Sequence, residues 1–557
     1  MQAFKFIEMK KIFILFFTLY AYSCTNLDLA PEDAFVDAVV FDNPEAYRSY
    51  LAKVYGAFTL TGQDGPAGDG DISIVNDEGF TSYIRSYWKA QELTTDEAVI
   101  GWTDAGIRDL HLHSWSSENQ FVRVLYYRIF YIIAYANDFL TQSTPSKLDE
   151  HNINDEWKAK IATYRSEARF LRALAYWHAL DLFRNVPILT KISTDLPSQA
   201  TPQELFEFIE SELIAIESEM VGPQANEYGR ADRAALWMLQ AKLYLNAEVY
   251  TGQAKYGEVI TAVNKITAAG YNLYPNYFEL FMADNHKAAA PYTGTPEVIF
   301  ALTADGKNSQ SWGNTTFLVH AGVGGTMSDN LVDGTEKVTG DGTEVKDPTE
   351  SLDNYGIGSG WGGLRTTKNM VAICQNIIAP GDTDARVNFY TYTHDIEIND
   401  IGTFEDGYAV VKWVNLDSQG NPGTDSDFPE TDYPIFRLGD AYLMYAEAFL
   451  RGGGGDAATA LGYINALRQR AYGNNSANIS TGELTLDFVL DERVRELYWE
   501  GTRRQDLIRY GQFSDQGIWP WKGGVMEGTT TSAIHDILPI PASDLNVNAN
   551  LKQNPGY

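Results

Sequence analysis

Several aromatic residues of this sequence lie in polar, glycine-rich stretches where a packed helix is not expected. Examples are Trp102, Tyr292, Trp312, Trp361 and Tyr392. Loops often carry binding residues on a rigid scaffold. A flat ring with Asn, Asp or Arg beside it suits a sugar, because the ring stacks on the C–H face of a pyranose while the polar neighbours bond to its hydroxyls. These residues therefore indicate carbohydrate binding. The alternative is that each ring fills a small local core under its loop.

Acidic residues are abundant enough to provide the pair of carboxylates, about 5–10 Å apart, that a glycoside hydrolase uses. No pair stands out in the sequence. In residues 491–500 the acids and arginines recur at spacings of three and four, which predicts a salt-bridged helix in preference to an acid–base site. The triplet Gly358-Ser359-Gly360 lacks the spacing of a hydrolase nucleophile elbow. We therefore expect no enzyme activity.

Candidate metal and phosphate sites also lack the required spacing. Residues 64–71 offer oxygen ligands for calcium but break the EF-hand pattern, so we interpret them first as a loop and only second as a metal site. The glycines at 452–455 are followed by Asp456, without the Lys and Ser or Thr of a phosphate-binding loop, which indicates a turn. His111 and His113 alternate as on a strand and match no zinc-binding pattern. We expect no cofactor, with calcium left open.

The charge balance excludes some classes of partner. The chain has 557 residues and a formal net charge of −32, so it would repel the phosphates of a nucleic acid and a generic anionic membrane surface. Hydrophobic residues at 44% and charged residues at 21% are typical of a folded protein. We expect no binding to nucleic acid.

The first residues predict export and lipid anchoring. After Met9 come two lysines, an apolar run over residues 12–19 and small residues before Cys24, which is the pattern of a signal peptide. The apolar run is too short to span a bilayer. We predict a lipoprotein signal peptide over residues 1–23 and lipidation of Cys24, since several acyl chains together anchor a protein durably. A secreted protein with an unmodified Cys24 is the alternative, and Cys374 is expected to be a buried, unpaired residue.

Apolar residues at spacings of three and four predict amphipathic helices through much of the chain. The first helix follows Asn43 and Pro44, which form a helix start signal. The predicted helical ranges are 43–55, 121–140, 157–183, 202–220, 233–250, 256–268, 438–450, 457–470 and 486–499. Between residues 271 and 433 the sequence is rich in glycine and aspartate, with short β-branched runs at 298–302 and 408–413. We expect loops with a few strands there.

Two helical pairs resemble each other. Residues 243–266 and 443–467 both read as helix, glycine-bearing turn and helix, with alanines that let the helices approach closely. Such hairpins stack on neighbours because none buries its apolar face alone. The predicted fold is therefore mainly α, with tetratricopeptide-like hairpins as a scaffold and a loop-rich, partly β region that carries the ligand site. The alternative is a coincidence of helical hairpins in an α-rich protein.

Blocks along the whole chain match a known family in order. Residues 433–448 read YPIFRLGDAYLMYAEA and residues 491–509 read DERVRELYWEGTRRQDLIR. The other blocks are 166–177 with 185–188, 232–246, and 538–541 with 553–557. With the cysteine at position 24, these blocks resemble the SusD/RagB family, the surface glycan-binding lipoproteins of Bacteroidetes.

The resemblance implies a single domain over residues 24–557. Its helical scaffold would cover about 40–270 and 435–515, and its loop-rich glycan-binding region about 60–115 and 271–433. Segments 60–68, 91–98 and 431–434 look closest to the starch-binding branch of the family.

In that branch an arc of aromatic rings, helped by an arginine and short polar side chains, holds a curved α-glucan. By resemblance, Trp102 and Trp312 are stacking rings and Arg85 is a hydroxyl partner. Tyr292 and one tyrosine among Tyr390, Tyr392 and Tyr408, with Tyr392 as the choice, are further candidate rings. Asp104 stands near a position where the branch uses Asn.

The resemblance also implies partners and a location. The expected function is non-catalytic binding of oligosaccharides, with α-1,4-glucans as the expected class, for delivery to a SusC-type TonB-dependent transporter. The protein would be lipid-anchored in the outer membrane and face the cell exterior. An exported helical-repeat scaffold without sugar binding and a glycoside hydrolase are the alternative functions.

Overall fold

The computed structural model describes residues 40–62, 66, 70–324, 327, 337–338, 344–345, 355–375, 384–391 and 393–557. The signal peptide, Cys24, Tyr392 and most of the calcium candidate at 64–71 lie outside the described residues. The expectations for these positions stay predictions, as does the division of the chain into scaffold and glycan-binding regions.

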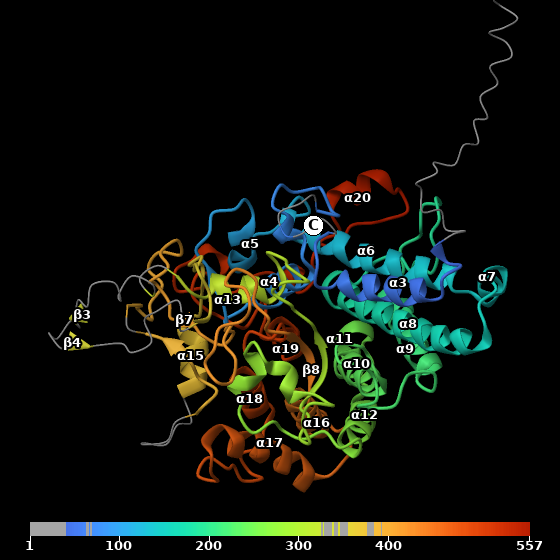
Figure 1. Ribbon diagram of the computed structural model, residues 1–557. Coiled ribbons are helices and arrows are strands. Elements are labelled where there is room, and N and C mark those ends of the chain that lie inside the picture. Colours follow the sequence, from blue (N-terminus) through green and yellow to red (C-terminus); the bar gives the residue numbers. More distant parts are fainter. Residues whose placement is uncertain are drawn as a thin grey trace, which may run out of the picture.

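The described part of the chain is mainly helical, with short strands (Figure 1). The helices are α3 (Glu45–Gly56), α4 (Tyr83–Glu92), α5 (Ile107–Leu112), α6 (Gln120–Gln142), α7 (Pro145–Glu150), α8 (Asp155–Phe183), α9 (Pro202–Ile216), α10 (Arg233–Leu245), α11 (Ala247–Thr251), α12 (Tyr256–Ala268), α13 (Asn314–Ala321), α15 (Lys368–Gln375), α16 (Leu438–Leu450), α17 (Ala457–Tyr472), α18 (Leu486–Leu497), α19 (Arg503–Arg509) and α20 (Ala542–Val547). The 3-10 helices are η1 (Glu78–Thr81), η2 (Phe278–Phe281), η3 (Asn285–Ala288), η5 (Lys522–Gly524) and η6 (Ala533–Asp536).

Helical hairpins stack on one another, which confirms the tetratricopeptide-like scaffold. Helix α6 packs on α8, α8 on α9, α10 on α12, α12 on α16, and α16 on α17 and α18. In Figure 1 these helices fill the right and lower parts of the molecule, while the loops with α13 and α15 lie on the left. The predicted helix over 233–250 is interrupted at Asn246, where α10 ends and α11 begins.

Local capping sets several helix starts. The Asn119 side chain accepts hydrogen bonds from the first turn of α6, and the Asn154 side chain caps α8. Helix α9 begins with a capping box between Thr201 and Glu204, with a proline in its first turn. These side chains satisfy backbone N–H groups that lack a partner within the helix. Apolar stripes predicted most of the long helices, and these caps fix where the helices begin.

The strands form antiparallel pairs. They are β1 (Val99–Ile100) with β5 (Leu364–Arg365), β2 (Val298–Leu302) with β8 (Tyr433–Arg437), β3 (Lys337–Val338) with β4 (Glu344–Val345), and β6 (Phe389–Tyr390) with β7 (Ala409–Val410). The predicted strand at 298–302 is confirmed, whereas the run at 408–413 pairs only at Ala409–Val410. Because β8 runs directly into α16, the β2–β8 pair attaches the loop-rich region to the helical scaffold.

The expectation that His111 and His113 lie on a strand is wrong. His111 belongs to α5, and His113 ends that helix with a left-handed φ of 53°. Both rings are buried: His111 hydrogen-bonds to the Pro520 carbonyl and His113 to the Thr94 carbonyl. Both partners lie outside α5, and Pro520 is more than 400 residues away in the sequence. Contacts in the folded chain, rather than the local alternation of residues, therefore fix the backbone conformation at His111 and His113. The expectation for Cys374 is confirmed, since it is buried and unpaired.

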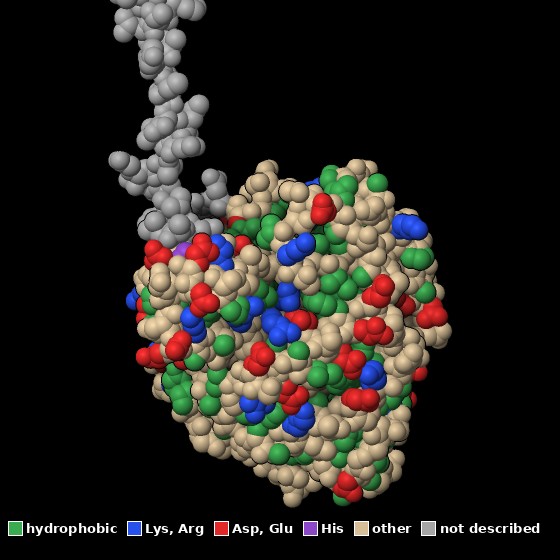
Figure 2. All heavy atoms as spheres, turned by 90° about the vertical axis from the view of Figure 1, so that its right-hand side faces the viewer, with side chains coloured by type: hydrophobic (Ala, Val, Ile, Leu, Met, Phe, Trp, Pro, Cys, Tyr) green, Lys and Arg blue, Asp and Glu red, His purple; other side chains and the backbone are tan. Residues whose placement is uncertain are grey.

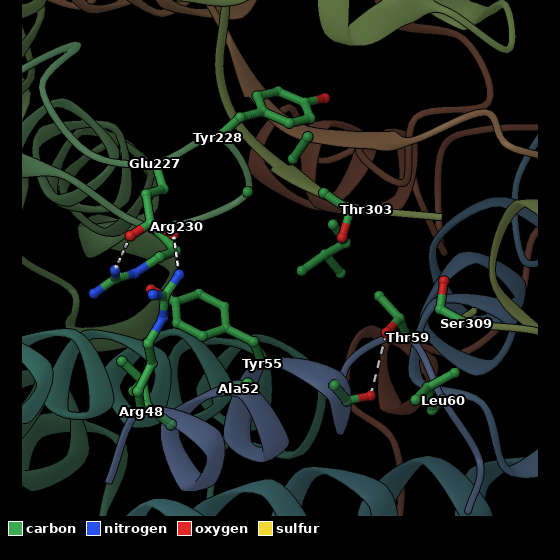
Figure 3. Close-up of a pocket in the computed structure, with 15 residues that line it drawn as sticks. Arg48, Ala52, Tyr55, Thr59, Leu60, Glu227, Tyr228, Arg230, Thr303 and Ser309 are labelled. Carbon is green, nitrogen blue, oxygen red and sulfur yellow. Dashed lines mark hydrogen bonds and ion pairs between the residues drawn. The ribbon is translucent and has the colours of Figure 1, made fainter. Parts of the chain in front are cut away.

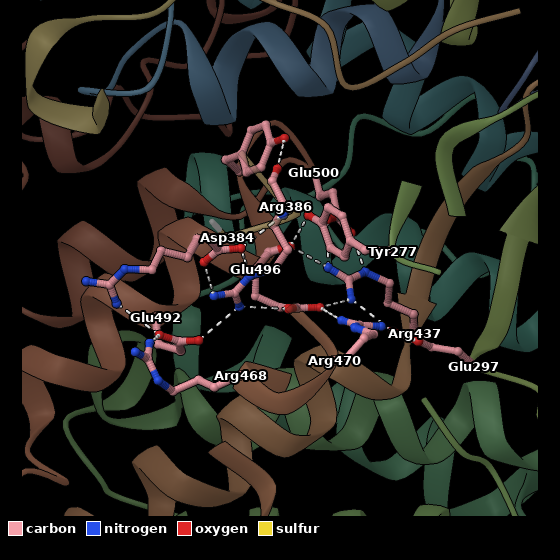
Figure 4. A network of polar contacts seen from close by, with 12 residues as sticks. Tyr277, Glu297, Asp384, Arg386, Arg437, Arg468, Arg470, Glu492, Glu496 and Glu500 are labelled. Atoms are coloured by element: carbon pink, nitrogen blue, oxygen red, sulfur yellow. Dashed lines mark hydrogen bonds and ion pairs between the residues drawn. The ribbon is translucent and has the colours of Figure 1, made fainter. Parts of the chain in front are cut away.

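A network of ionised side chains lies in the interior (Figure 4). Glu492 and Glu496 of α18 both bond to Nη1 of Arg386, at 2.9 and 3.1 Å. Nη1 of Arg437, the last residue of β8, lies 2.6 Å from Glu496 and 3.0 Å from Glu297. All of these side chains are buried. The other members are Asp384, Lys412, Arg468, Arg470, Arg495 and Glu500. The network joins α18 to the loop-rich region.

The predicted local ion pairs of α18 form part of this network. Arg495 lies 2.9 Å from Glu492 and 3.8 Å from Asp491. Burial raises the pKa of Glu492, but the charges of Arg386, Arg495 and Arg468 outweigh that effect and lower the pKa to about 2. A buried charge is tolerated only with such partners. The salt-bridged helix is therefore confirmed, and most of its charge partners come from other segments.

The surface carries charges of both signs. Figure 2 shows acidic and basic side chains interspersed over the face that lies at the right of Figure 1. Among the described residues, no helix combines the length and the apolar character needed to cross a membrane.

We expect Glu492→Gln to destabilise the fold by about 3 kcal/mol at pH 7, because it leaves buried arginines around a neutral group. The pKa of Glu492 falls from 4.5 to about 2 on folding. Its contribution is therefore complete above pH 4.5 and is lost as the pH falls towards 2. The measurement is the free energy of unfolding in urea at several pH values.

The control for this variant is Glu397→Gln, which removes an exposed partner of Lys368 and should change stability little. A difference between wild type and Glu492→Gln that stays constant from pH 7 to pH 2 would contradict an ionised Glu492.

Candidate functional site

A surface hollow of about 360 Å³ collects residues from distant parts of the chain. Its lining residues are Asp77, Phe80, Arg85, Trp102, Asp104, Trp312 and Trp361. Four of the six residues predicted for glycan binding lie here: Arg85, Trp102, Asp104 and Trp312. Arg85 comes from α4, Trp102 from the segment after β1, and Trp312 from the segment before α13. The hollow therefore forms only when these three segments come together in the folded chain.

Three partly exposed indoles form a bent wall of this hollow. The Trp361 ring lies between the other two, with its centroid 6.2 Å from that of Trp102 and 6.0 Å from that of Trp312. The planes are tilted by 47° and 52°. A further ring packs beside each indole and limits its movement. These rings are Phe317 for Trp102, His320 for Trp361 and Phe428 for Trp312.

Pairing of two short strands positions Trp102. Because Ile100 of β1 pairs with Leu364 of β5, the residues after β1 lie against the residues before β5. The Trp102 indole Nε1 donates to the Gly362 carbonyl at 3.2 Å. A Cβ on Gly363 would lie 2.5 Å from the same nitrogen. Only glycine at position 363 leaves room for the indole, so this glycine-rich segment packs against a ring that lines the hollow.

Arg85 brings a buried positive charge to the hollow. Its Nη1 donates to the Trp312 carbonyl at 3.0 Å, and its guanidinium lies 4.7 Å from the centre of the Phe80 ring. Burial lowers the pKa of Arg85 to about 10, although Asp77 and Asp104 oppose the shift. In the described part of the chain, no carboxylate forms an ion pair with this guanidinium. Its charge is therefore not neutralised by direct contact with an acid.

Tyr292 is not among the residues that line the hollow. Its ring is 56% exposed and lies 5.8 Å from the Tyr228 ring and 4.9 Å from the His286 ring. Tyr392, as stated above, lies outside the described residues. The roles of both tyrosines in glycan binding stay predictions.

The hollow also contains residues outside the set predicted for glycan binding. Trp361 was one of the aromatic residues in glycine-rich stretches, and this was a signal that could have found it. Phe80 and Asp77 had no comparable signal. Asp77 Oδ1 accepts a hydrogen bond from the Gly79 N–H at 2.9 Å and caps η1.

The hollow can stack flat apolar faces on its indoles and offer N–H donors and carboxylate acceptors at their edges. Among the described residues, no group of three His, Cys, Asp or Glu side chains is placed to hold a metal ion. Fold and hollow together define a helical-repeat protein with an open surface hollow lined by aromatic rings.

Comparisons with known proteins agree with this class. A model described as the SusD family matches residues 296–557. The chain is 36% identical to "Starch-binding protein SusD" of Bacteroides thetaiotaomicron, with 96% of each chain covered. It is 25% identical to "SusD-like protein P2" of Formosa agariphila, over 87% of this chain and 92% of the relative. This protein belongs to the SusD family.

Solved structures show the same fold at lower identity. A SusD homologue from Bacteroides thetaiotaomicron matches with a TM-score of 0.68 at 20% identity, over 94% of this chain and 98% of that one. "Surface glycan-binding protein A" from the same organism, in complex with laminarihexaose, matches with a TM-score of 0.64 at 19% identity, over 92% and 99%.

We expect Gly363→Ala to displace the Trp102 indole, because the added Cβ would lie 2.5 Å from Nε1. The Nε1–H of Trp102 then loses its hydrogen bond to Gly362, and its exchange with solvent should become at least about ten-fold faster. The measurement is indole N–H exchange by NMR in ¹⁵N-tryptophan-labelled protein. Gly294→Ala is the matched control, since its Cβ would contact nothing within 4 Å. An unchanged Trp102 signal in Gly363→Ala contradicts the close packing.

Proposed function

We propose that this protein is a non-catalytic receptor for neutral oligosaccharides, with α-1,4-glucans as the class it binds. The observation that carries the proposal is the bent wall of Trp102, Trp361 and Trp312 beside the buried Arg85. The indoles stack on successive sugar rings, while Arg85 and the carboxylates of Asp77 and Asp104 bond to hydroxyls.

The shape of the wall supports a curved ligand. Neighbouring indole planes differ by 47° and 52°, so a chain that touches all three rings has to bend. A chain that is already helical loses less conformational entropy on such a surface than a straight, flexible one. The 36% identity to a relative named for starch binding supports the same ligand class. Since three rings share the contact, we expect chains that are long enough to touch all three to bind more tightly than shorter ones.

The absence of catalysis is part of the proposal. Asp77 and Asp104 are the carboxylates that line the hollow. A glycoside hydrolase needs one carboxylic acid and one carboxylate on opposite sides of the scissile bond. Asp77 Oδ1 is engaged as the cap of η1, which favours a structural and hydroxyl-binding role over acid catalysis.

The proposal includes a location and a partner. Membership of the SusD family and the lipoprotein-like sequence before Cys24 support anchoring by lipid in the outer membrane, with the hollow facing the cell exterior. From there the receptor hands oligosaccharides to a SusC-type TonB-dependent transporter. The stacked helical hairpins provide an extended surface of the kind that repeat proteins use for docking.

We expect amylopectin to retard the protein in affinity electrophoresis, and laminarin, levan and xylan not to do so. Trp102→Ala, Trp312→Ala and Trp361→Ala should each lower the affinity for amylopectin at least about ten-fold, or about 1.4 kcal/mol, because each removes a stacking surface. The measurement uses the soluble protein that begins after Cys24. Trp157→Ala, on α8 and outside the hollow, is the matched control.

Other outcomes of this experiment would point to other functions. Retardation by a different glycan keeps the receptor function and changes the linkage. Retardation by none, with wild-type folding, favours a scaffold without sugar binding. Shorter chains appearing when maltoheptaose is incubated with the protein would identify a glycoside hydrolase.

A further inference from the structure

A second cavity, of about 310 Å³, lies beside α3 (Figure 3). One wall is a face of α3, and the other is formed by the turn at Gly229 and the end of β2. It shares no lining residue with the aromatic hollow. The two are nevertheless close in the sequence, because Ser309 lines the cavity and Trp312 lines the hollow. Its volume is at the lower end of the range for small-molecule sites.

Two tyrosine rings with fixed polar ends line this cavity. The Tyr55 hydroxyl donates to Glu167 at 2.7 Å and accepts from the Ala231 N–H at 2.9 Å. The Tyr228 hydroxyl donates to Asp432 at 2.5 Å. Because each hydroxyl is already bonded, each ring offers mainly its carbon surface to the cavity. Such rings lose little freedom when a ligand packs on them.

The charges at one end of the cavity are matched. Arg48 lies 2.8 Å from Glu227, and Arg230 lies 3.0 Å from Glu227 and 2.6 Å from Glu167. Figure 3 shows Arg48, Glu227 and Arg230 together at this end. An anionic ligand would meet Glu227, and a cationic one would meet Arg48. The arrangement therefore suits a neutral ligand. The exposed Arg48–Glu227 pair contributes little to stability, so its groups can turn to ligand hydroxyls.

Hydroxyl groups lie at the other end. Thr59, Thr303 and Ser309 line it, as Figure 3 shows. Thr59 donates to the Gly56 carbonyl at 3.2 Å, which leaves its oxygen free to accept. The Ser309 hydroxyl makes only a long contact of 3.4 Å to the Asp305 carbonyl. A purely apolar ligand would bury these hydroxyls without new partners, which is unfavourable.

We infer that this cavity is a second carbohydrate site, which takes one sugar ring of a neutral oligosaccharide between the Tyr55 ring and the hydroxyls of Thr59, Thr303 and Ser309. The aromatic tyrosine surface suits the C–H face of a pyranose, and the matched charges and hydroxyls suit its edge. The inference rests on the proposed function, since it concerns the same class of ligand. It adds a site that is chemically and spatially separate from the indole wall.

The test is an NMR titration of the full chain with maltotriose, with leucine methyl groups and tryptophan indoles labelled together. Leu51 and Leu302 line the cavity and report on it, while the Trp102 indole reports on the aromatic hollow. We expect the Leu51 and Leu302 signals to shift with a saturation curve that differs from that of the Trp102 indole. In Trp312→Ala, which impairs the aromatic hollow, the leucine shifts should persist.

Two cavity variants and a control complete the test. Ser309→Trp, which fills the cavity, should abolish the leucine shifts, and Thr303→Val, which removes one hydroxyl, should weaken them at least about five-fold. Both should leave the Trp102 titration as in wild type, which also reports correct folding. Lys307→Ala, on the same loop but outside the cavity lining, should behave as wild type.

The outcomes separate this inference from the proposed function. If the Leu51 and Leu302 signals do not shift at a maltotriose concentration that saturates the Trp102 titration, the second site is overturned and the proposed function is not affected. Leucine shifts that remain in Ser309→Trp also overturn it, because they then report a transmitted change. In a third outcome the Trp102 indole signal does not shift, the leucine signals do, and Ser309→Trp abolishes the leucine shifts. That result overturns the aromatic receptor site and supports the cavity site.

Discussion

Glu496 of α18 lies among three arginines that come from separate segments of the chain. Arg386 precedes β6, Arg437 ends β8 and Arg470 lies on α17, and each of them contacts the Glu496 carboxylate. Every side chain in this cluster is buried, so none of these charges has water to stabilise it. Each must keep its partners in place. The helical scaffold and the loop-rich region therefore cannot separate without leaving charges unpaired in the interior.

This constraint extends from the network to the aromatic hollow through the residues after α18. The Trp499 N–H donates to the Glu97 carboxylate at 3.0 Å, and its indole donates to the Glu97 carbonyl at 3.1 Å. Trp88 of α4 in turn donates to the Trp499 carbonyl at 3.0 Å. Arg85 lies one helical turn before Trp88. The position of Arg85 beside the indole wall thus depends on a chain of buried contacts that begins at α18, and a preformed wall costs a ligand little ordering.

Long helices with recurring apolar residues were predictable, and two short, fully buried helices were not. α9 shows an apolar stripe and a capping box, so its sequence is sufficient to predict it. All residues of the short helices α4 and α13 are buried. In α4 the apolar pairs Tyr83-Ile84 and Tyr87-Trp88 recur at a helical spacing, but the polar side chains of its other face are buried by the rest of the fold. The sequence of α13 shows no clear apolar stripe. The same limit applies to the site. Trp102 and Trp312 could be selected as rings in glycine-rich loops, whereas Asp77 and Phe80 had no such pattern and joined the hollow through the fold.

The sequence by itself determined the class of the protein: repeated helical hairpins, ring-bearing loops and ordered family blocks depend on local spacing, which can be read along the chain. The tertiary structure alone decided which rings meet. Trp361 lies between Trp102 and Trp312 because β1 pairs with β5, while the exposed Tyr292 packs beside Tyr228 and does not line the hollow. The physical reason is that a binding surface is defined by distances between residues remote in sequence, and these distances follow from burial, strand pairing and charge pairing across the whole molecule.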